Sequence, residues 1–365
     1  MLGPELALAA SAREWPDRVH RFLLDHGGGR VRSRVMGAEQ TLASEFEVLL
    51  IDDICSFLTP RLIRRLRDQG REVIGVFSPE DGPDAKRRLL ECGITDVIEG
   101  DATPEEFLQI VRSTLAHRGP VSVVKEILPS AGFRVGVLSA ATGSGCTEVA
   151  VALAGHLAKT EDVVLLDFDQ SHPGVSQRLD LPLHPNLRTA VDLAHHDVSK
   201  LDEALQAVGD IRVVGGLAVP AHSGSLPVIE LTGLLEDLGA TYPMLVIDLG
   251  EAQGAVSVKT DARVVVAEAS PVGLTRLVRA VEHETSTHGP DVLAVVSRVP
   301  GGGHRSDDIR AELASALPEI PTVILPEDRR ISQAAWSGEL ELRGPFARGV
   351  GRIAHLIAEE AARDG

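Results

Sequence analysis

Short apolar runs alternate with amphipathic stretches along the first third of the chain. The apolar runs predict strands at 6–10, 31–35, 46–51, 73–77 and 96–98. Stretches with helical spacing between them predict helices at 13–25, 60–69, 84–91 and 104–116. The segment 28–44 fits this pattern worst and predicts a short helix at most. Strands that alternate with helices are typical of βαβ units and a parallel sheet.

A second, longer alternation begins at Phe133. It predicts strands at 133–139, 162–167, 211–215, 243–249, 263–268, 291–297 and 322–325. It predicts helices at 147–158, 187–194, 200–207, 227–238, 272–287, 305–316, 329–336 and 346–363. Turn residues around 117–130 indicate a linker. We therefore expect an α/β protein with one domain at 1–118, a linker at 119–131 and a doubly wound domain at 132–365, whose ligands bind at the carboxyl ends of strands.

Composition narrows the class of protein. Of 365 residues, 44% are hydrophobic and 24% are charged, which is typical of a soluble protein. The net charge of −17 argues against direct nucleic-acid binding, because phosphate neutralisation needs clustered Lys and Arg. Three cysteines without a Cys-x-x-Cys pair indicate a reducing compartment and no zinc site. No signal peptide or membrane span is evident, so we expect a cytoplasmic protein.

One loop has the setting of a phosphate-binding loop, because it follows an apolar strand and precedes a helix. Against the pattern G-x-x-x-x-G-K-[ST], Gly145 and Thr147 fit, whereas Ala140 replaces the first glycine and Cys146 replaces the lysine. The alternative is a loop that only connects strand to helix. The candidate nucleotide-binding residues of the loop are Ala140, Ala141, Thr142, Gly143, Ser144, Gly145, Cys146 and Thr147.

Carboxylates follow two further apolar strands. Asp167 and Asp169 end one strand, and Asp248 ends another in the arrangement that holds Mg²⁺ in nucleotide-binding proteins. The Thr147 hydroxyl would be a further ligand, so Thr147, Asp167 and Asp248 are the candidate metal ligands. The stretch Leu325-Pro-Glu-Asp328 follows a late strand, where a base-contacting loop could lie.

With these segments the chain resembles the MinD/ParA superfamily of ATPases. The family loop, Gly-Lys-Gly-Gly-x-Gly-Lys-Thr, aligns with 140–147, so Ala141 and Cys146 stand where both signature lysines should be. The resemblance implies ATP and Mg²⁺ as cofactors and Asp169 as the group that orients the attacking water. It also implies nucleotide contacts by Pro326 and Asp328. Ser297-Arg298 departs from the family, whose members often carry an adenine-reading Asn there.

The missing lysines set the expected activity. Charge-assisted contacts to phosphate are about twice as strong as neutral ones, and electrostatic stabilisation dominates phosphoryl transfer. We therefore expect weak or lost nucleotide binding and at most a weak ATPase activity.

The first domain resembles a response-regulator receiver, a flavodoxin-like fold. Asp52 matches the phospho-acceptor position and Ser78 the hydroxyl position. The acidic pair after the first strand is absent, and Glu99-Gly-Asp101 replaces the receiver lysine. We expect Asp52 to be part of a solvated strand end, and the domain to be a pseudo-receiver that serves as an interaction module.

A pseudo-receiver fused to a MinD-like domain is similar to the CpaE/TadZ group, closest to its actinobacterial septum site-determining branch. The resemblance implies a homodimer that acts in septum-site determination, or in polar localisation of Tad pilus or secretion machinery, through protein partners. The C-terminal stretch 353–365 is short, acidic and rich in alanine, so we expect no direct membrane insertion and recruitment to septum or pole by a partner.

Two other functions stay open. The protein could be an active Mg²⁺-dependent ATPase in which Lys125, Arg134 or Arg298 replaces the lost cation. It could also be a redox or phosphorylation sensor. That sensor would use Cys146, whose place at a helix N-terminus favours a reactive thiol, or Asp52.

Overall fold

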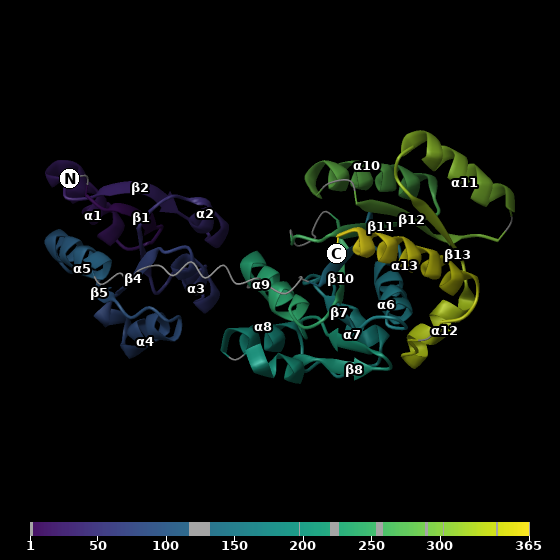
Figure 1. Ribbon diagram of the computed structural model, residues 1–365, viewed down its shortest axis with the longest axis horizontal. Helices are drawn as coiled ribbons and strands as arrows, with labels where there is room; N and C mark the ends of the chain where they lie inside the picture. Colours follow the sequence, from purple (N-terminus) through teal and green to yellow (C-terminus); the bar gives the residue numbers. More distant parts are fainter. Residues whose placement is uncertain are drawn as a thin grey trace. The chain divides into compact units, whose positions relative to one another are not determined.

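The computed structural model describes residues 3–116, 132–196, 198–219, 226–252, 258–288, 291–301, 303–340 and 342–364. The chain divides into two compact units, Met1–Glu126 and Ile127–Gly365, each built around its own sheet (Figure 1). The linker expected at 119–131 and Lys125 lie outside the described residues.

The first unit contains a five-stranded parallel sheet. Its strands are β1 (Glu5–Ala9), β2 (Arg30–Val35), β3 (Val48–Asp52), β4 (Glu72–Phe77) and β5 (Val97–Glu99), in the order β2-β1-β3-β4-β5. This is the order of flavodoxin-like doubly wound sheets. Every residue of the central strand β3 is buried, which explains why its sequence is a continuous apolar run.

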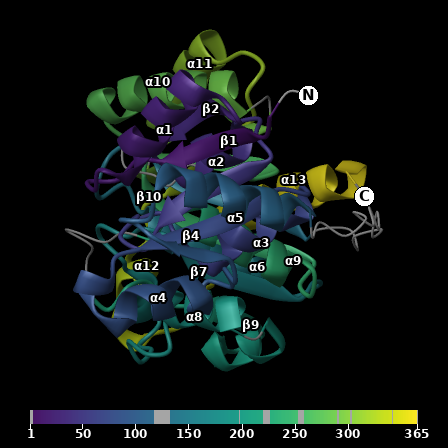
Figure 2. The same cartoon turned by 90° about the vertical axis from the view of Figure 1, so that its left-hand side faces the viewer.

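Helices cover both faces of this sheet. Helices α1 (Trp15–His26) and α5 (Pro104–Ala116) lie side by side in Figure 2 and bury one face, where the Trp15 and Phe107 rings stack with centroids 5.9 Å apart. The remaining helices are α2 (Ala38–Ala43), α3 (Pro60–Asp68) and α4 (Pro83–Glu91). Leu89 of α4 packs against Gly75 of β4, on the face opposite that cluster. The six-residue α2 agrees with the short helix expected in 28–44.

Strand β2 lies at one edge of the sheet and reads Arg-Val-Arg-Ser-Arg-Val. Its three arginines, Arg30, Arg32 and Arg34, are exposed, while Val35 is buried. Arg32 pairs with Glu5 at 3.2 Å, and Arg34 pairs with Asp17 at 2.5 Å. Charged side chains on an edge strand oppose pairing with another sheet.

The second unit contains an eight-stranded sheet in the order β13-β12-β11-β6-β10-β7-β9-β8. The strands are β6 (Phe133–Ser139), β7 (Val163–Asp167), β8 (Gln206–Val208), β9 (Ile211–Val214), β10 (Met244–Glu251), β11 (Ala262–Glu268), β12 (Val292–Val299) and β13 (Thr322–Pro326). All pair in parallel except β8, which is antiparallel to β9. The mixed α/β architecture with parallel sheets is therefore confirmed.

The prediction of a helix at 200–207 was wrong in part. The chain forms a 3-10 segment at Val198–Ala204, and the strand β8 follows it. A two-residue turn at Gly209 and Asp210 then reverses the chain into β9, and Gly209 has φ +52°, which glycine adopts without strain. Tertiary pairing with β9 thus overrides the local helical pattern.

Two helical layers enclose the second sheet (Figure 1). One consists of α6 (Cys146–Leu157), the short α7 (Val175–Arg178) and α13 (Pro345–Asp364). The other consists of α8 (Leu187–His196), α9 (Val228–Gly239), α10 (Pro271–His288) and α11 (Gly303–Ala316). Helix α12 (Arg329–Ser337) follows β13. Within the described ranges, every helix is too short or too polar to span a membrane.

Candidate functional site

The loop 140–145 joins the carboxyl end of β6 to the N-terminus of α6, near the middle of the second sheet. Gly143 has φ +81° and Gly145 has φ +89°, a left-handed region that costs other residues free energy. Gly145 is also the N-cap residue of α6. The two glycines that remain in the degenerate motif are thus the ones that the backbone path needs.

Polar contacts fix the loop to its neighbours. The Ser139 and Ser144 hydroxyl oxygens lie 2.8 Å apart. The Ser297 hydroxyl, on β12, donates to the Ser144 carbonyl at 2.5 Å, and the Thr142 hydroxyl donates to Glu251 of β10 at 2.7 Å. The sequence singled out Ser297 only as a departure from a family pattern, whereas the structure makes it a support of the loop.

The loop also keeps the features that attract an anion. The first backbone bond of α6 runs from the Val149 N–H to the Gly145 carbonyl, at 3.0 Å. The N–H groups of Cys146 and Thr147 therefore have no acceptor within their helix. Together with the helix dipole they favour negative charge at this point.

Asp248 lies behind the loop, buried at the end of an inner strand. One carboxylate oxygen accepts from the Cys146 thiol at 3.2 Å and from the Gly250 N–H at 3.2 Å. The other accepts from the Thr147 hydroxyl at 2.6 Å. Burial raises the pKa of Asp248 in spite of these bonds. The residue that replaces the lysine thus contacts a carboxylate.

Asp167 is opposite Asp248 in the register of β7 and β10. It accepts N–H groups of Gly174 at 2.9 Å and Val175 at 3.0 Å. Burial, and then the charge of Asp248, raise the pKa of Asp167 well above its usual value. Two adjacent buried carboxylates favour either a shared proton or a cation between them.

Asp169 is held at the same end of β7. Its carboxylate accepts the N–H groups of Ser171 at 3.0 Å and His172 at 2.8 Å. Gly250, with φ +71°, lies so close that a Cβ there would overlap the Asp169 carboxylate. The structure therefore places Asp167, Asp169, Asp248 and Thr147 near one another, at the carboxyl ends of β7 and β10.

This donor set suits Mg²⁺, because carboxylate and hydroxyl oxygens are the ligands that hard cations take. The set is incomplete by itself: no group of three His, Cys, Asp or Glu within the described ranges is arranged to hold a metal. Mg²⁺ ordinarily completes its octahedron with water and substrate phosphates. The residues present therefore fit a metal that arrives with a nucleotide.

Pro326 ends β13, the outermost strand of the sheet, and Asp328 follows two residues later. Both therefore lie on the side of the sheet where the parallel strands have their carboxyl ends. Asp328 caps α12 by accepting the Arg330 N–H at 3.2 Å, and it pairs with Arg330 Nε at 2.9 Å. Burial would raise the pKa of Asp328, but the contacts from Arg330 outweigh it and lower the pKa. The recorded contacts of this side chain are thus those of a helix cap.

Of the two described candidates for a substitute cation, Arg134 and Arg298, one lies far from the loop and the other lies beside it. Arg134 is the second residue of β6, near the end of the strand opposite the loop, so it cannot face a phosphate held there. Arg298 follows Ser297 at the loop's edge of the sheet, where it is exposed and has φ +53°. The β12–β13 register shifts at this point, and such a bulge re-aims a side chain.

The environment of Cys146 argues against the alternative of a reactive thiol. The residue is only 7% exposed. Burial, and then the charge of Asp248, raise the pKa of the thiol well above its usual value. Burial and the nearby carboxylates thus outweigh the helix N-terminus, which by itself would lower the pKa of the thiol.

The expectation that Asp52 is solvated is also wrong, because Asp52 is fully buried at the end of β3. The Ser11 hydroxyl and the Trp15 indole donate to its Oδ2, at 2.5 and 2.9 Å. Arg13 Nη1 lies 3.4 Å from Asp52 Oδ1 and 2.6 Å from Asp53 Oδ1. Arg13 also pairs with Asp81. A single guanidinium thus pairs with three carboxylates, which the sequence pattern did not reveal.

Arg178 is a second residue that sequence reasoning missed. Its Nε donates to both Glu148 carboxylate oxygens, at 2.7 and 2.8 Å. Its Nη1 donates to the carbonyls of Ala334 and Glu339, at 3.3 and 3.1 Å. A buried arginine therefore ties the first turn of α6 to the end of α12. In the sequence, the only signal for this role is the position of Arg178 at the end of a short helix.

Several solved structures are similar in fold. The septum site-determining protein MinD complexed with Mg-ADP from Pyrococcus horikoshii OT3 has 18% identity and a TM-score of 0.53, covering 64% of this chain and 99% of that one. A ParA family ATPase from Chlorobium tepidum TLS has 16% identity and a TM-score of 0.51, covering 62% and 98%. The MinC:MinD cell division protein complex of Aquifex aeolicus has 15% identity and a TM-score of 0.51, covering 62% and 96%.

No protein-family model and no curated protein matches the sequence. The share of the chain that the solved structures cover corresponds to the size of the larger unit. The resemblance to MinD/ParA ATPases is thus confirmed at the level of fold, and the chain contains a domain with the fold of those ATPases.

Proposed function

We propose that this chain is a positioning protein of the MinD/CpaE type, in which nucleotide binding is weak or lost and hydrolysis is slow at most. Its role is septum-site determination, or polar localisation of a Tad pilus or secretion apparatus. It acts as a cytoplasmic homodimer that protein partners recruit. The fold shared with MinD and ParA structures, one of them in complex with MinC, supports a positioning role in general.

One observation carries the proposal: the Cys146 thiol and the Thr147 hydroxyl both donate to Asp248. Residues 146 and 147 thus donate hydrogen bonds to the Asp248 carboxylate, and position 146 offers no cation to a phosphate. A bound nucleotide would have to rely on Mg²⁺, backbone N–H groups and the helix dipole. Those contacts alone would hold a nucleotide weakly at most, and the charge that stabilises phosphoryl transfer is missing.

The retained residues define what a bound nucleotide would meet. Mg²⁺, when bound, would supply the positive charge that the phosphates need. Thr147 and the carboxylates of Asp167 and Asp248 would hold it, and Asp169 would orient the attacking water. Loop residues 140–147 would surround the phosphates. Pro326 and Asp328 would lie on the base side.

The first unit supports the same proposal as a pseudo-receiver. Its strand order is that of the flavodoxin-like class, and Asp52 ends β3, as a phospho-acceptor would. Asp52 is fully buried, and Arg13 already lies 3.4 Å from its carboxylate. We therefore assign the unit a role in protein contacts that does not depend on phosphorylation.

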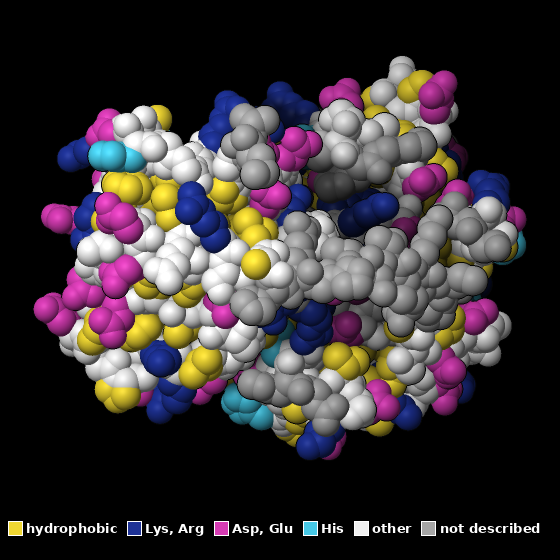
Figure 3. Space-filling model, turned by 60° about the vertical axis from the view of Figure 1, so that its left-hand side comes forward, with side chains coloured by type: hydrophobic (Ala, Val, Ile, Leu, Met, Phe, Trp, Pro, Cys, Tyr) yellow, Lys and Arg dark blue, Asp and Glu magenta, His cyan; other side chains and the backbone are white. Residues whose placement is uncertain are grey.

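The surface agrees with protein partners rather than nucleic acid. On the face drawn in Figure 3, described Lys and Arg side chains are interspersed with Asp and Glu side chains, and form no continuous basic surface. The net charge of −17 opposes direct contact with nucleic-acid phosphates. We propose that a protein partner recruits the chain.

Calorimetric titration of the whole chain with Mg-ATP tests the proposal. We expect weak binding, with a Kd of about 1 mM or above, equivalent to about −4 kcal/mol or weaker. Phosphate release should be the same in the wild type and in Asp169→Ala, because no efficient turnover depends on Asp169. Tight binding with turnover that disappears in Asp169→Ala would contradict the proposal.

A second candidate function, a Mg²⁺-dependent ATPase with a substituted cation, rests on Arg298. Its backbone is left-handed at a bulge, beside the serine that supports the loop. If Arg298 neutralises phosphate, Arg298→Gln should lower Mg-ATP affinity about tenfold, the effect of about 1.4 kcal/mol. Arg363→Gln, at the exposed end of α13, is the matched charge control. Equal affinities in both variants would remove this candidate.

A further inference from the structure

One carboxylate beside the loop 140–147 does not belong to the candidate metal ligands. Glu251, the last residue of β10, is half-buried, and its Oε2 accepts a hydrogen bond from the Thr142 hydroxyl at 2.7 Å. Thr142 lies in the loop that leads into the N-terminus of α6, where an anion would bind. A carboxylate therefore lies at a place that attracts negative charge.

A bulge in β10 gives Glu251 this position. In the register of β10 and β6, Asp248 pairs with Val137. Glu251, three residues later, pairs with Ser139, which is only two residues after Val137. Gly250 lies within this stretch and has φ +71°. An extra residue of this kind bends a strand and re-aims its side chains.

Hydrogen bonds hold this end of β10 against the start of the loop. The Ala252 N–H donates to the Ser139 carbonyl at 2.8 Å. The Ser139 hydroxyl accepts from the Ala141 N–H at 3.1 Å and lies 2.8 Å from the Ser144 hydroxyl. Ser139 therefore connects the end of β10 to both halves of the loop, and the backbone that carries Glu251 is fixed relative to it.

The charge of Glu251 sets the effect of this contact on a ligand. Its recorded partner, the Thr142 hydroxyl, is neutral, so the contact leaves the charge of the carboxylate in place. Like charges a few ångströms apart repel more strongly near a protein surface than in bulk water. Nucleoside triphosphates carry several negative charges, so a carboxylate at the loop opposes their binding more than that of less charged ligands.

We propose that Glu251 determines the specificity of the candidate nucleotide site by repelling the phosphates of a ligand, while Thr142 holds its carboxylate at the loop. The site thereby disfavours nucleoside triphosphates through an added negative charge as well as through the missing lysines. This inference rests on the proposed function, because it takes the loop 140–147 as the place where phosphates bind.

Calorimetric titration of the full chain with Mg-ATP compares the wild type with Glu251→Gln, which keeps the shape of the side chain and removes its charge. We expect Glu251→Gln to bind about tenfold more tightly, between the effects of one unit charge in bulk water and near a protein surface. The same pair is compared in the Cys146→Lys background, whose added charge favours measurable binding. Raising KCl from about 0.1 M to about 1 M shortens the Debye length from about 10 Å to about 3 Å, so the gain should shrink.

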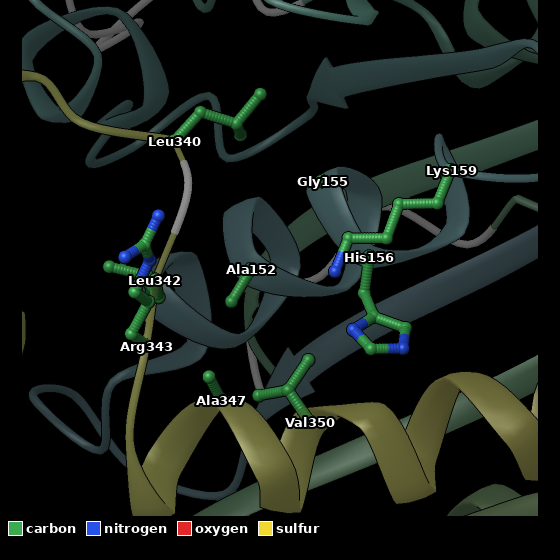
Figure 4. A pocket seen from close by; sticks show the side chains of 9 residues that line it. All are labelled: Ala152, Gly155, His156, Lys159, Leu340, Leu342, Arg343, Ala347 and Val350. Carbon is green, nitrogen blue, oxygen red and sulfur yellow. The ribbon is translucent and has the colours of Figure 1, made fainter.

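Glu161→Gln is the matched control, because it makes the same change in charge at the opposite end of α6. Glu161 is exposed and follows the last residue of α6 by four positions. Figure 4 shows this end of the helix, with His156 and Lys159 at a pocket between α6 and α13. Glu161→Gln should leave the affinity unchanged. Thr142→Val should tighten binding less than Glu251→Gln, because the carboxylate remains beside the loop.

Equal affinities of Glu251→Gln and its parent protein in both backgrounds would overturn the proposal. Weaker binding by Glu251→Gln would also overturn it, because Glu251 would then hold the metal rather than repel the phosphates. A gain as large in Thr142→Val or in Glu161→Gln, or one that salt leaves unchanged, would show that the charge of Glu251 is not the cause. The proposed function fails separately, when the wild type itself binds Mg-ATP tightly, since the ratio of affinities is measured whatever the wild-type Kd is.

Discussion

Replacing Cys146 by lysine is expected to tighten Mg-ATP binding by roughly ten- to a hundredfold, because a charged hydrogen bond contributes about 1.5–3 kcal/mol. The new ammonium would extend from the N-terminus of α6, beside Asp248, Asp167 and Asp169, which lower the free energy of a cation there. It would also release Asp248 from the thiol that now donates to it. Calorimetric titration measures the change in Kd.

Cys146→Met is the matched control, since it lengthens the side chain without adding charge, and it should not tighten binding. Turnover in Cys146→Lys should rise but stay low, because Ala141 still stands at the second lysine position. The double variant Ala141→Lys/Cys146→Lys should hydrolyse ATP faster than either single variant. A Kd in Cys146→Lys equal to that of the wild type would show that more than the lysine has been lost from this loop.

Arg13→Ala is expected to destabilise the first unit by about 2–4 kcal/mol. Removing one partner of a buried ion pair costs about 3–5 kcal/mol, and this arginine is 18% exposed, which reduces the loss. Asp52 and Asp53 would remain close together without a counter-charge. The free energy of unfolding in urea can be followed by Trp15 fluorescence, because the other tryptophan, Trp336, is 91% exposed and changes little on unfolding.

Arg13→Lys should lose less than Arg13→Ala, because it keeps the charge but not the forked geometry. Arg32→Ala removes a surface pair at 3.2 Å and should cost less than about 1 kcal/mol. If Arg13→Ala costs no more than Arg32→Ala, the guanidinium does not support this cluster.

The sequence predicts the strands well because most of them are buried on both faces and appear as apolar runs. The runs at 46–51 and 243–249 agree with β3 and β10 to within two residues. The antiparallel β8 could not be predicted from its own residues, since its pairing with β9 across the Gly209 turn determines it. The spacing of apolar residues along a segment predicts strands and helices with a regular hydrophobic period. It does not predict elements that form because of a turn or of pairing with a distant strand.

The same contrast holds for the site. Asp167, Asp169 and Asp248 could be placed together, because carboxyl ends of adjacent parallel strands meet at one edge. What those carboxylates contact could not be predicted. Whether Asp52 is solvated depends on where the loop after β1 brings Arg13, 39 residues earlier in the chain. The pKa of Cys146 likewise depends on burial that no local pattern encodes.

The arginines of β2 limit the way in which this protein can form assemblies. If two copies paired through β2, their arginine side chains would come close together. Repulsion between these like charges opposes the formation of a continuous sheet across the two copies. At the opposite edge, β5 is only three residues long and offers little to extend. We therefore expect any contact that the first unit makes to use its helices and loops rather than to continue its sheet.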